Sequence, residues 1–292
     1  MTDGTTPIEI SVIVPSYNSA RTIRRCLESL LHQHTARSYE IIVADSSTDD
    51  TPAIVGTFGG RVRLVRNDRQ LPPGPARNLG VREARGAILA FTDSDCVPEP
   101  DWLEQIARAH ERHEAVGGRI DNGTPGSWCG TALYLAEFVE FGGGPERVVA
   151  SMPSCNISYS RRLFDAHGGF PDVAWGEEYI FNHRLPDGVL FTPAAAVRHV
   201  NRTGFGETLH HARRVGHGSA ISRWATGQLG FLFRWPVLIP LLWFYRLARI
   251  AALSLRAGRF TSFAWALPML ILDLGAWTLG FRDGARESRQ LR

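Results

Sequence analysis

AILAFTDSD, residues 87–95, is an apolar run that ends in two carboxylates, Asp93 and Asp95. The apolar part predicts a short buried strand over Ala87–Phe91. Because side chains alternate across a strand, residues two apart point to the same side, so both carboxylates should face one site. Such a pair favours a hard cation, Mg²⁺ or Mn²⁺, whose open coordination positions phosphate oxygens can fill. The alternative is a pair of turn residues before the prolines that follow, and this stretch alone does not decide between the two.

The N-terminal part of the chain alternates predicted strands with predicted helices. The strands are expected at Ile8–Pro15, Tyr39–Ala44, Val62–Val65 and Ala87–Phe91. This alternation predicts an α/β fold with a doubly wound, mostly parallel sheet. Ligands of such sheets bind beyond the carboxyl ends of the strands. Polar residues gather at those ends, namely Tyr17 and Asn18, Asp45 to Ser47, Arg77 and Asn78, and Asp93 and Asp95.

Two further patterns lie in the second half of the chain. Glu177 and Glu178 follow Gly176 and occupy the first turn of a predicted helix, where the helix dipole alone would favour acidic residues. A strand predicted over 191–200 ends at His199. A single histidine at a strand end is either a structural residue or a metal ligand. Both patterns therefore allow a structural and a functional explanation.

Charge is distributed unevenly along the chain. Residues 198–292 hold 14 Arg and four acidic residues, a net charge of +10, whereas residues 1–197 hold 18 Arg and 25 acidic residues, a net charge of −7. A basic, apolar C-terminal part favours an anionic membrane surface over nucleic acid as a partner. Four scattered cysteines and no recognisable secretory signal favour a reducing cytoplasmic environment.

The C-terminal part contains two long apolar segments. Phe260–Phe281 has 22 residues with one charge, Asp273, and is long enough to span a bilayer. Leu229–Leu253 is interrupted by arginines and prolines, which suits a segment lying in the membrane interface. The alternative is a pair of buried helices that pack on the rest of the protein. We therefore expect a catalytic domain over 1–220 and an apolar, Arg-rich, membrane-associating helical region over 221–292.

Taken together, the motifs resemble the family 2 glycosyltransferases, which are inverting enzymes with the nucleotide-sugar-binding GT-A fold. The resemblance covers about residues 8–220 and rests on SVIVPSYN (11–18), IVADSSTD (42–49), GPARNLG (74–80), DSD (93–95), Asn156, GGF (168–170), GEE (176–178) and His199. The apolar end also resembles the membrane-associated end of many family members. The resemblance implies a nucleoside-diphosphate-sugar donor and a Mn²⁺ or Mg²⁺ cofactor.

The resemblance assigns roles to individual residues. The expected donor-binding residues are Pro15, Tyr17, Asn18, Asp45, Arg77, Asp93 and Asn156. The expected metal ligands are Asp95, Asp93 and His199. Arg213 and Arg214 are candidates for holding a diphosphate or the acceptor, with a solvated basic helix face as the alternative.

Inversion requires a base that takes the proton of the acceptor hydroxyl as its oxygen attacks. The family places this base at the second acid of a Glu-Asp pair, which is Glu178 here, one methylene longer than the usual Asp. Glu177 is then expected to orient the acceptor. A second departure is Asp45-Ser46-Ser47, where many members carry two adjacent acids. One carboxylate suffices for base recognition, so we interpret this as variation.

The sequence thus predicts a metal-dependent inverting glycosyltransferase that acts on a hydroxyl acceptor, in cell-envelope or lipid-linked glycan synthesis at the cytoplasmic face of the membrane. Two alternatives stay open. A sugar-nucleotide nucleotidyltransferase would use a similar nucleotide-binding domain, but it would carry a Gly-rich basic loop where Pro15 to Asn18 stand. A non-catalytic sugar-nucleotide-binding scaffold would not need the paired acids. The motifs leave the nucleobase, the sugar and the acceptor open.

Overall fold

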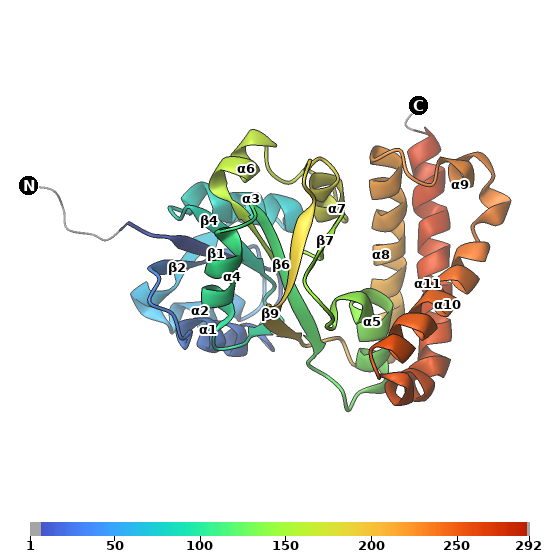
Figure 1. Cartoon of the computed structure of the whole chain (residues 1–292), viewed down its shortest axis with the longest axis horizontal. Helices are drawn as coiled ribbons and strands as arrows, with labels where there is room; N and C mark the ends of the chain where they lie inside the picture. Colours follow the sequence, from blue (N-terminus) through green and yellow to red (C-terminus); the bar gives the residue numbers. More distant parts are fainter. Residues whose placement is uncertain (1–6, 291–292) are drawn as a thin grey trace, which may run out of the picture.

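A computed structural model describes residues 7–290, in which nine strands form one mixed sheet (Figure 1). The strand order is β3-β2-β1-β4-β8-β6-β9-β5, and β7 pairs with β9 outside this path. The strands are β1 (Ile10–Ser16), β2 (Tyr39–Asp45), β3 (Arg63–Arg66), β4 (Ile88–Thr92), β5 (Cys96–Pro98), β6 (Ala115–Asn122), β7 (Arg147–Val149), β8 (Asn156–Ser160) and β9 (Val189–His199).

The first four strands form the parallel part of the sheet. β1 pairs in parallel with both β2 and β4, and β2 pairs in parallel with β3. The crossover helices are α1 (Ile23–Leu31), α2 (Thr51–Gly56) and α3 (Pro73–Glu83). The apolar runs bury fully in the central strands, where Ile13 of β1 and Phe91 of β4 have no exposed surface. The predicted α/β class and these four strands are therefore confirmed, with ends that shift by one or two residues.

The rest of the sheet is mixed. β8 pairs antiparallel with β4 and β6, and β9 pairs in parallel with β6 but antiparallel with β5 and β7. A register shift between Gly118 and Arg119 bends the pairing of β6 with β9. The other helices of this part are α4 (Trp102–His110), α5 (Trp128–Glu137), α6 (Arg161–Ala166) and α7 (Glu177–Asn182), with 3₁₀ turns at Gly59–Arg61 and Val139–Phe141.

The C-terminal helices form a separate layer beside the sheet (Figure 1). They are α8 (Phe205–Ala225), α9 (Gly230–Arg234), a 3₁₀ turn (Pro236–Leu238), α10 (Leu241–Arg256) and α11 (Phe260–Gln290). α8 and α11 approach backbone to backbone, since a Cβ at Gly280 would lie 1.9 Å from the carbonyl oxygen of Arg213. The predicted domain boundary at 220/221 falls inside α8, and it stays a prediction.

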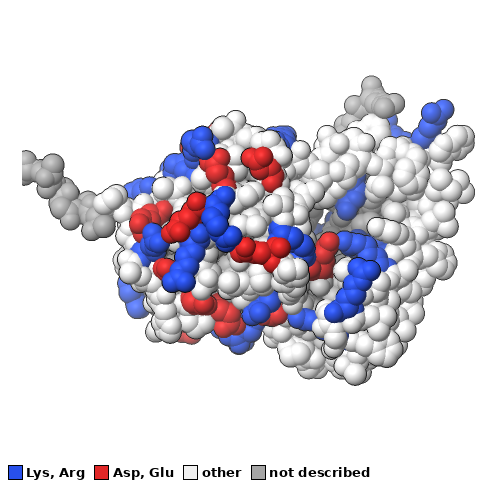
Figure 2. Space-filling view, viewed as in Figure 1, with Lys and Arg blue, Asp and Glu red and all other residues white. Residues whose placement is uncertain are grey.

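Two helical segments, Pro236–Arg256 and Phe260–Gln290, are long and apolar enough to cross a membrane. α11 nevertheless buries one side in the protein, including Met269, Leu274 and Asp273. The segment 231–245 instead exposes more than half of six large apolar side chains, which are Phe231, Trp235, Val237, Leu241, Phe244 and Tyr245. Figure 2 shows charged side chains gathered over the sheet, whereas much of the surface over the C-terminal helices is uncharged.

Candidate active site

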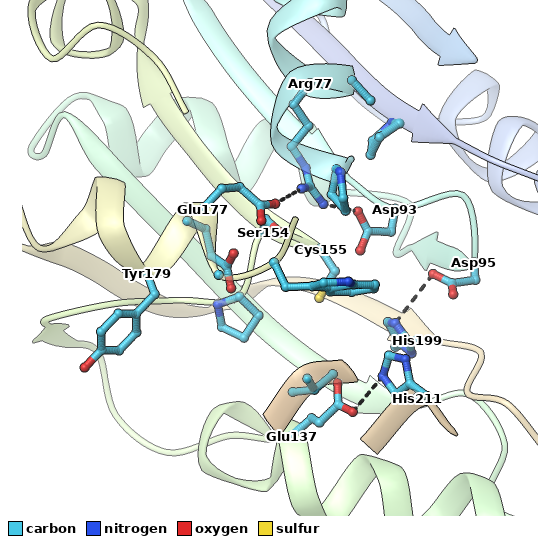
Figure 3. A pocket seen from close by; sticks show the side chains of 18 of the residues that line it. Arg77, Asp93, Asp95, Glu137, Ser154, Cys155, Glu177, Tyr179, His199 and His211 are labelled. Atoms are coloured by element: carbon cyan, nitrogen blue, oxygen red, sulfur yellow. Dashed lines mark hydrogen bonds and ion pairs between the residues drawn. The ribbon is translucent and has the colours of Figure 1, made fainter. Parts of the chain in front are cut away.

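A cavity of about 370 Å³ lies between the carboxyl ends of β1 and β4 and the helices α7 and α8 (Figure 3). Its position fits the rule that open α/β sheets bind ligands beyond their carboxyl strand ends. Eight of the residues predicted from the sequence line it: Pro15, Tyr17, Arg77, Asp93, Asp95, Glu177, Glu178 and His199. Residues from five separate parts of the chain thus meet at one place.

Asp93 and Asp95 line this cavity from a turn, not from a strand. β4 ends at Thr92, and the amide of Cys96 donates to the carbonyl oxygen of Asp93 at 2.9 Å as the chain turns into β5. Strand alternation was therefore the wrong reason for expecting the two carboxylates on one side. The turn brings both into the cavity but gives them different neighbours.

Arg77 is buried between two carboxylates. Its Nη2 donates to Asp93 Oδ1 at 2.6 Å, and its Nη1 donates to Glu177 Oε1 at 2.5 Å. Burial opposes the charge of Arg77, but the two acids outweigh it and raise the pKa of the guanidinium. Because Asp93 and Glu177 each hold one of its terminal nitrogens, Arg77 ties α3 to α7 and fixes the wall of the cavity. Glu177 was expected to orient the acceptor; its carboxylate is bonded to Arg77, and that role stays a prediction.

Glu178 is the carboxyl that Arg77 does not bond. Gly176 enters α7 with a φ of 81°, a left-handed conformation that favours glycine and directs the first turn of the helix into the cavity. Burial, followed by the charge of Glu177, raises the pKa of Glu178 to about 8. Burial also raises the pKa of Glu177. A carboxyl with such a pKa is suited to accept a proton near neutral pH.

Asp95 and His199 form the pair best suited to hold a cation. His199 Nε2 lies 3.5 Å from Asp95 Oδ1, and this oxygen is buried without a hydrogen-bond partner. The ring Nδ1 lies 3.0 Å from Asn201 Oδ1, which assigns the proton to Nδ1 and leaves the Nε2 lone pair facing Asp95. Cys96 is also within ligand range, but burial raises the pKa of its thiol, and hard cations prefer oxygen. The orphaned carboxylate oxygen and the free imidazole nitrogen fit Mn²⁺ or Mg²⁺.

Three predicted donor-binding residues lie outside the cavity lining. Asp45 is buried and bonds Ser47 and Arg66, and Asn18 bonds the amide of Thr48 at 2.9 Å. Asn156 is almost fully buried, and its Nδ2 donates to two carbonyl oxygens. Its Oδ1 accepts from the Trp102 indole at 2.8 Å. The side chain of Asn156 is thus used within the fold, and its assignment to the donor stays a prediction without a contact in its favour.

Arg213 and Arg214 also lie outside the cavity lining. Arg213 Nη2 donates to Asp283 of α11 at 2.7 Å, so it helps to join α8 to α11. The guanidinium of Arg214 lies 4.7 Å from the centre of the Trp175 ring. Trp175 lines the cavity, so Arg214 lies next to its wall, and a role of the two arginines in substrate binding stays a prediction.

The cavity wall also contains residues that the sequence did not point to, among them Glu137, His211 and Arg223. His211 Nε2 lies 2.9 Å from Glu137 Oε1. Burial acts to raise the pKa of Glu137, but the interaction with His211 outweighs it, so the pKa of Glu137 is lowered. One signal for Glu137 was present, since it is the single acid of the otherwise uncharged helix α5. His211 and Arg223 had no such signal, because their position depends on the packing of α8.

Comparisons with known proteins bear on the fold and on the family. Solved GT-A glycosyltransferases share the fold. The mannosyltransferase PcManGT from Pyrobaculum calidifontis, in complex with GDP-Man and Mn²⁺, has a TM-score of 0.57 at 18% identity, covering 91% of this chain and 89% of that one. S. aureus TarS 1-349 in complex with UDP-GlcNAc has a TM-score of 0.55 at 19% identity, covering 98% and 93%.

The family profile described as "Glycosyl transferase family 2" matches residues 11–157. The glycosyltransferase AglE of Haloferax volcanii is 40% identical over 226 residues, which cover 72% of each chain. The succinoglycan biosynthesis protein ExoO of Rhizobium meliloti is 36% identical over 154 residues, which cover 52% of this chain and 43% of ExoO. The chain belongs to glycosyltransferase family 2.

Proposed function

We propose that this chain is a metal-dependent, inverting glycosyltransferase that moves a sugar from a nucleoside-diphosphate sugar to a hydroxyl acceptor. The observation that carries the proposal is a single cavity that holds Glu178, with its raised pKa, and the cation-suited pair of Asp95 and His199. The fold shared with structures that contain GDP-Man with Mn²⁺, or UDP-GlcNAc, supports the donor class.

The donor nucleoside would lie against Pro15 and Tyr17, which line the cavity at the end of β1. Asp95 and His199 would hold the metal, with Asp93 beside them. A bound divalent cation offsets the negative charge that develops on the leaving diphosphate. Arg77 keeps Asp93 and Glu177 in place through its two ion pairs.

Glu178 would act as the general base. Its carboxylate would accept the proton of the acceptor hydroxyl while that oxygen forms a bond to the anomeric carbon of the donor sugar. The bond from this carbon to the diphosphate oxygen breaks on the opposite face, and the nucleoside diphosphate leaves with the bonding electrons. Attack opposite to the leaving group inverts the anomeric configuration.

The metal assignment predicts that Asp95→Asn abolishes the effect of Mn²⁺ on nucleotide binding. In the native protein, Mn²⁺ should tighten the binding of the preferred nucleoside diphosphate, UDP or GDP, by at least about tenfold, since carboxylates alone repel the diphosphate. The measurement is a calorimetric titration with and without Mn²⁺. Asp187→Asn, in an exposed turn, is the matched control and should behave as the native protein does. An unchanged Mn²⁺ effect in the Asp95 variant would contradict the assignment.

We further propose that the protein works at the cytoplasmic face of a membrane, in cell-envelope or lipid-linked glycan synthesis. The exposed apolar side chains of 231–245 and the basic C-terminal part support an interfacial position. α11 would then lie beside the membrane and not across it, because one of its sides packs in the protein.

This position predicts co-sedimentation with vesicles that contain phosphatidylglycerol. Trp235→Glu with Phe244→Glu should reduce the bound fraction several-fold, because each change removes an exposed apolar anchor and adds a repelled charge. Phe205→Glu changes an equally exposed aromatic residue at the start of α8 and should leave binding unchanged. Equal sedimentation of the double variant and the native protein would exclude this surface.

A further inference from the structure

The cavity continues past the catalytic carboxyls toward the C-terminal end of α8. Tyr179 lies on the side of Glu177 away from Asp95 and His199 (Figure 3). Ser219, Ser222 and Arg223 of α8 line the cavity together with Tyr179. If the donor diphosphate lies at the Asp95 end, this opposite end is the space available to the acceptor.

Arg223 is a cation without an ion pair in the part of the chain that the structure describes. Its guanidinium lies 4.8 Å from the centre of the Tyr179 ring, and its Nη1 donates to the carbonyl oxygen of Ser219 at 3.1 Å. Burial, above all, lowers the pKa of Arg223, and Arg249 adds like-charge repulsion. Glu178 acts on Arg223 in the opposite sense to Arg249 but forms no ion pair with it, so the remaining N–H donors are free in a partly buried place.

Arg77, another arginine of the cavity wall, shows the contrast. Arg77 is buried as well, but two carboxylates compensate its charge. A desolvated charge without a counterion is unfavourable, so its retention in a cavity points to an anionic ligand. The planar fork of N–H donors in a guanidinium matches the oxygens of a phosphate group. The contact with the Tyr179 ring helps to hold the guanidinium in this part of the cavity.

We infer that the acceptor carries a phosphate group, which Arg223 binds while the acceptor hydroxyl lies at Glu178. The inference rests on the proposed function, because it uses Glu178 as the base that marks the reacting hydroxyl. The charges in the cavity agree with it, since Tyr179, whose ring Arg223 contacts, lies away from Asp93 and Asp95 (Figure 3). The phosphate could belong to a lipid or to a soluble sugar phosphate.

The test is calorimetric binding of three probes to the full chain: dodecyl phosphate, glucose 6-phosphate and dodecyl maltoside. EDTA is present so that the carboxylates of Asp93 and Asp95 repel phosphate from the metal end. The native protein should bind a phosphate probe at least about tenfold more tightly than dodecyl maltoside. Arg223→Gln should lose this preference, Arg223→Lys should keep part of it, and Arg286→Gln, an exposed arginine of α11, should keep all of it.

The arms of this experiment separate the possible outcomes. Tight binding of dodecyl phosphate alone supports a lipid-borne phosphate, whereas binding of both phosphate probes supports a soluble one. Equal affinity of the native protein for all three probes, or no loss in Arg223→Gln, overturns the inference. Mn²⁺-linked nucleotide binding by Arg223→Gln should equal that of the native protein. If the native protein showed no Mn²⁺-linked nucleotide binding, that result would refute the proposed function and not this inference alone. A melting temperature for Arg223→Gln that matches the native value shows that the variant is folded.

Discussion

Glu178→Gln is expected to lower kcat by about 10²–10⁴-fold, which is the usual contribution of a positioned general base. The amide keeps the size of the side chain but cannot accept the hydroxyl proton. Donor binding should not change, because the metal pair of Asp95 and His199 is intact. The measurement is the release of nucleoside diphosphate at saturating donor and acceptor. Glu207→Gln makes the same chemical change at an exposed residue of α8 and should keep native activity.

The pH dependence of kcat/KM provides an independent readout of the same residue. Only the ionised carboxylate accepts a proton, and the pKa of Glu178 is raised to about 8. The rate should therefore increase about tenfold per pH unit below pH 8 and level off above it. Full activity of Glu178→Gln, or a flat profile between pH 6 and pH 9, would contradict its role as the base.

Gly280→Ala is expected to destabilise the protein by about 1–3 kcal/mol or more, the usual cost of overpacking. The new Cβ would lie 1.9 Å from the carbonyl oxygen of Arg213, so the backbones of α8 and α11 must separate. This cost exceeds the gain of about 1 kcal/mol that alanine normally brings to a helix. Since α8 carries His211 and Arg223 in the cavity wall, activity should fall together with stability.

Gly275→Ala is the matched control on the same helix. A Cβ at Gly275 meets no atom within 4 Å, so only the gain in helix propensity is left and stability should rise slightly. Urea denaturation of both variants gives the comparison. Equal stability of the two variants would show that α8 and α11 are not closely packed, and that the C-terminal helices are not part of the site.

The parallel half of the fold could be predicted from the sequence because its signals are local. The apolar runs of β1 and β4 are continuous, and helical patterns separate the strands. The other half could not, since β5 and β7 have three residues each and find their partners far away in the chain. Their pairing depends on tertiary contacts that no local pattern encodes.

The site was predictable to the extent that short motifs define it. Glu178, Asp95 and His199 were expected together and line one cavity. Asn156 belongs to a motif position as well, yet its side chain supports the fold, so position in a motif did not establish contact with the donor. Arg223 could not be found from the sequence, because only the packing of α8 beside α7 brings it to the cavity.

The central claim is inverting, metal-dependent glycosyl transfer, and product analysis tests it most directly. The native protein is incubated with α-linked UDP- and GDP-sugars and Mn²⁺, with water in place of the acceptor hydroxyl, and proton NMR follows the nucleotide and the anomeric configuration of the sugar as it is released. We expect one donor to yield nucleoside diphosphate and the β-configured product, and neither Asp95→Asn nor Glu178→Gln to do so. A product with the α configuration would contradict the claim, and so would pyrophosphate formed in a second incubation that contains a nucleoside triphosphate and a sugar phosphate in place of the sugar nucleotides.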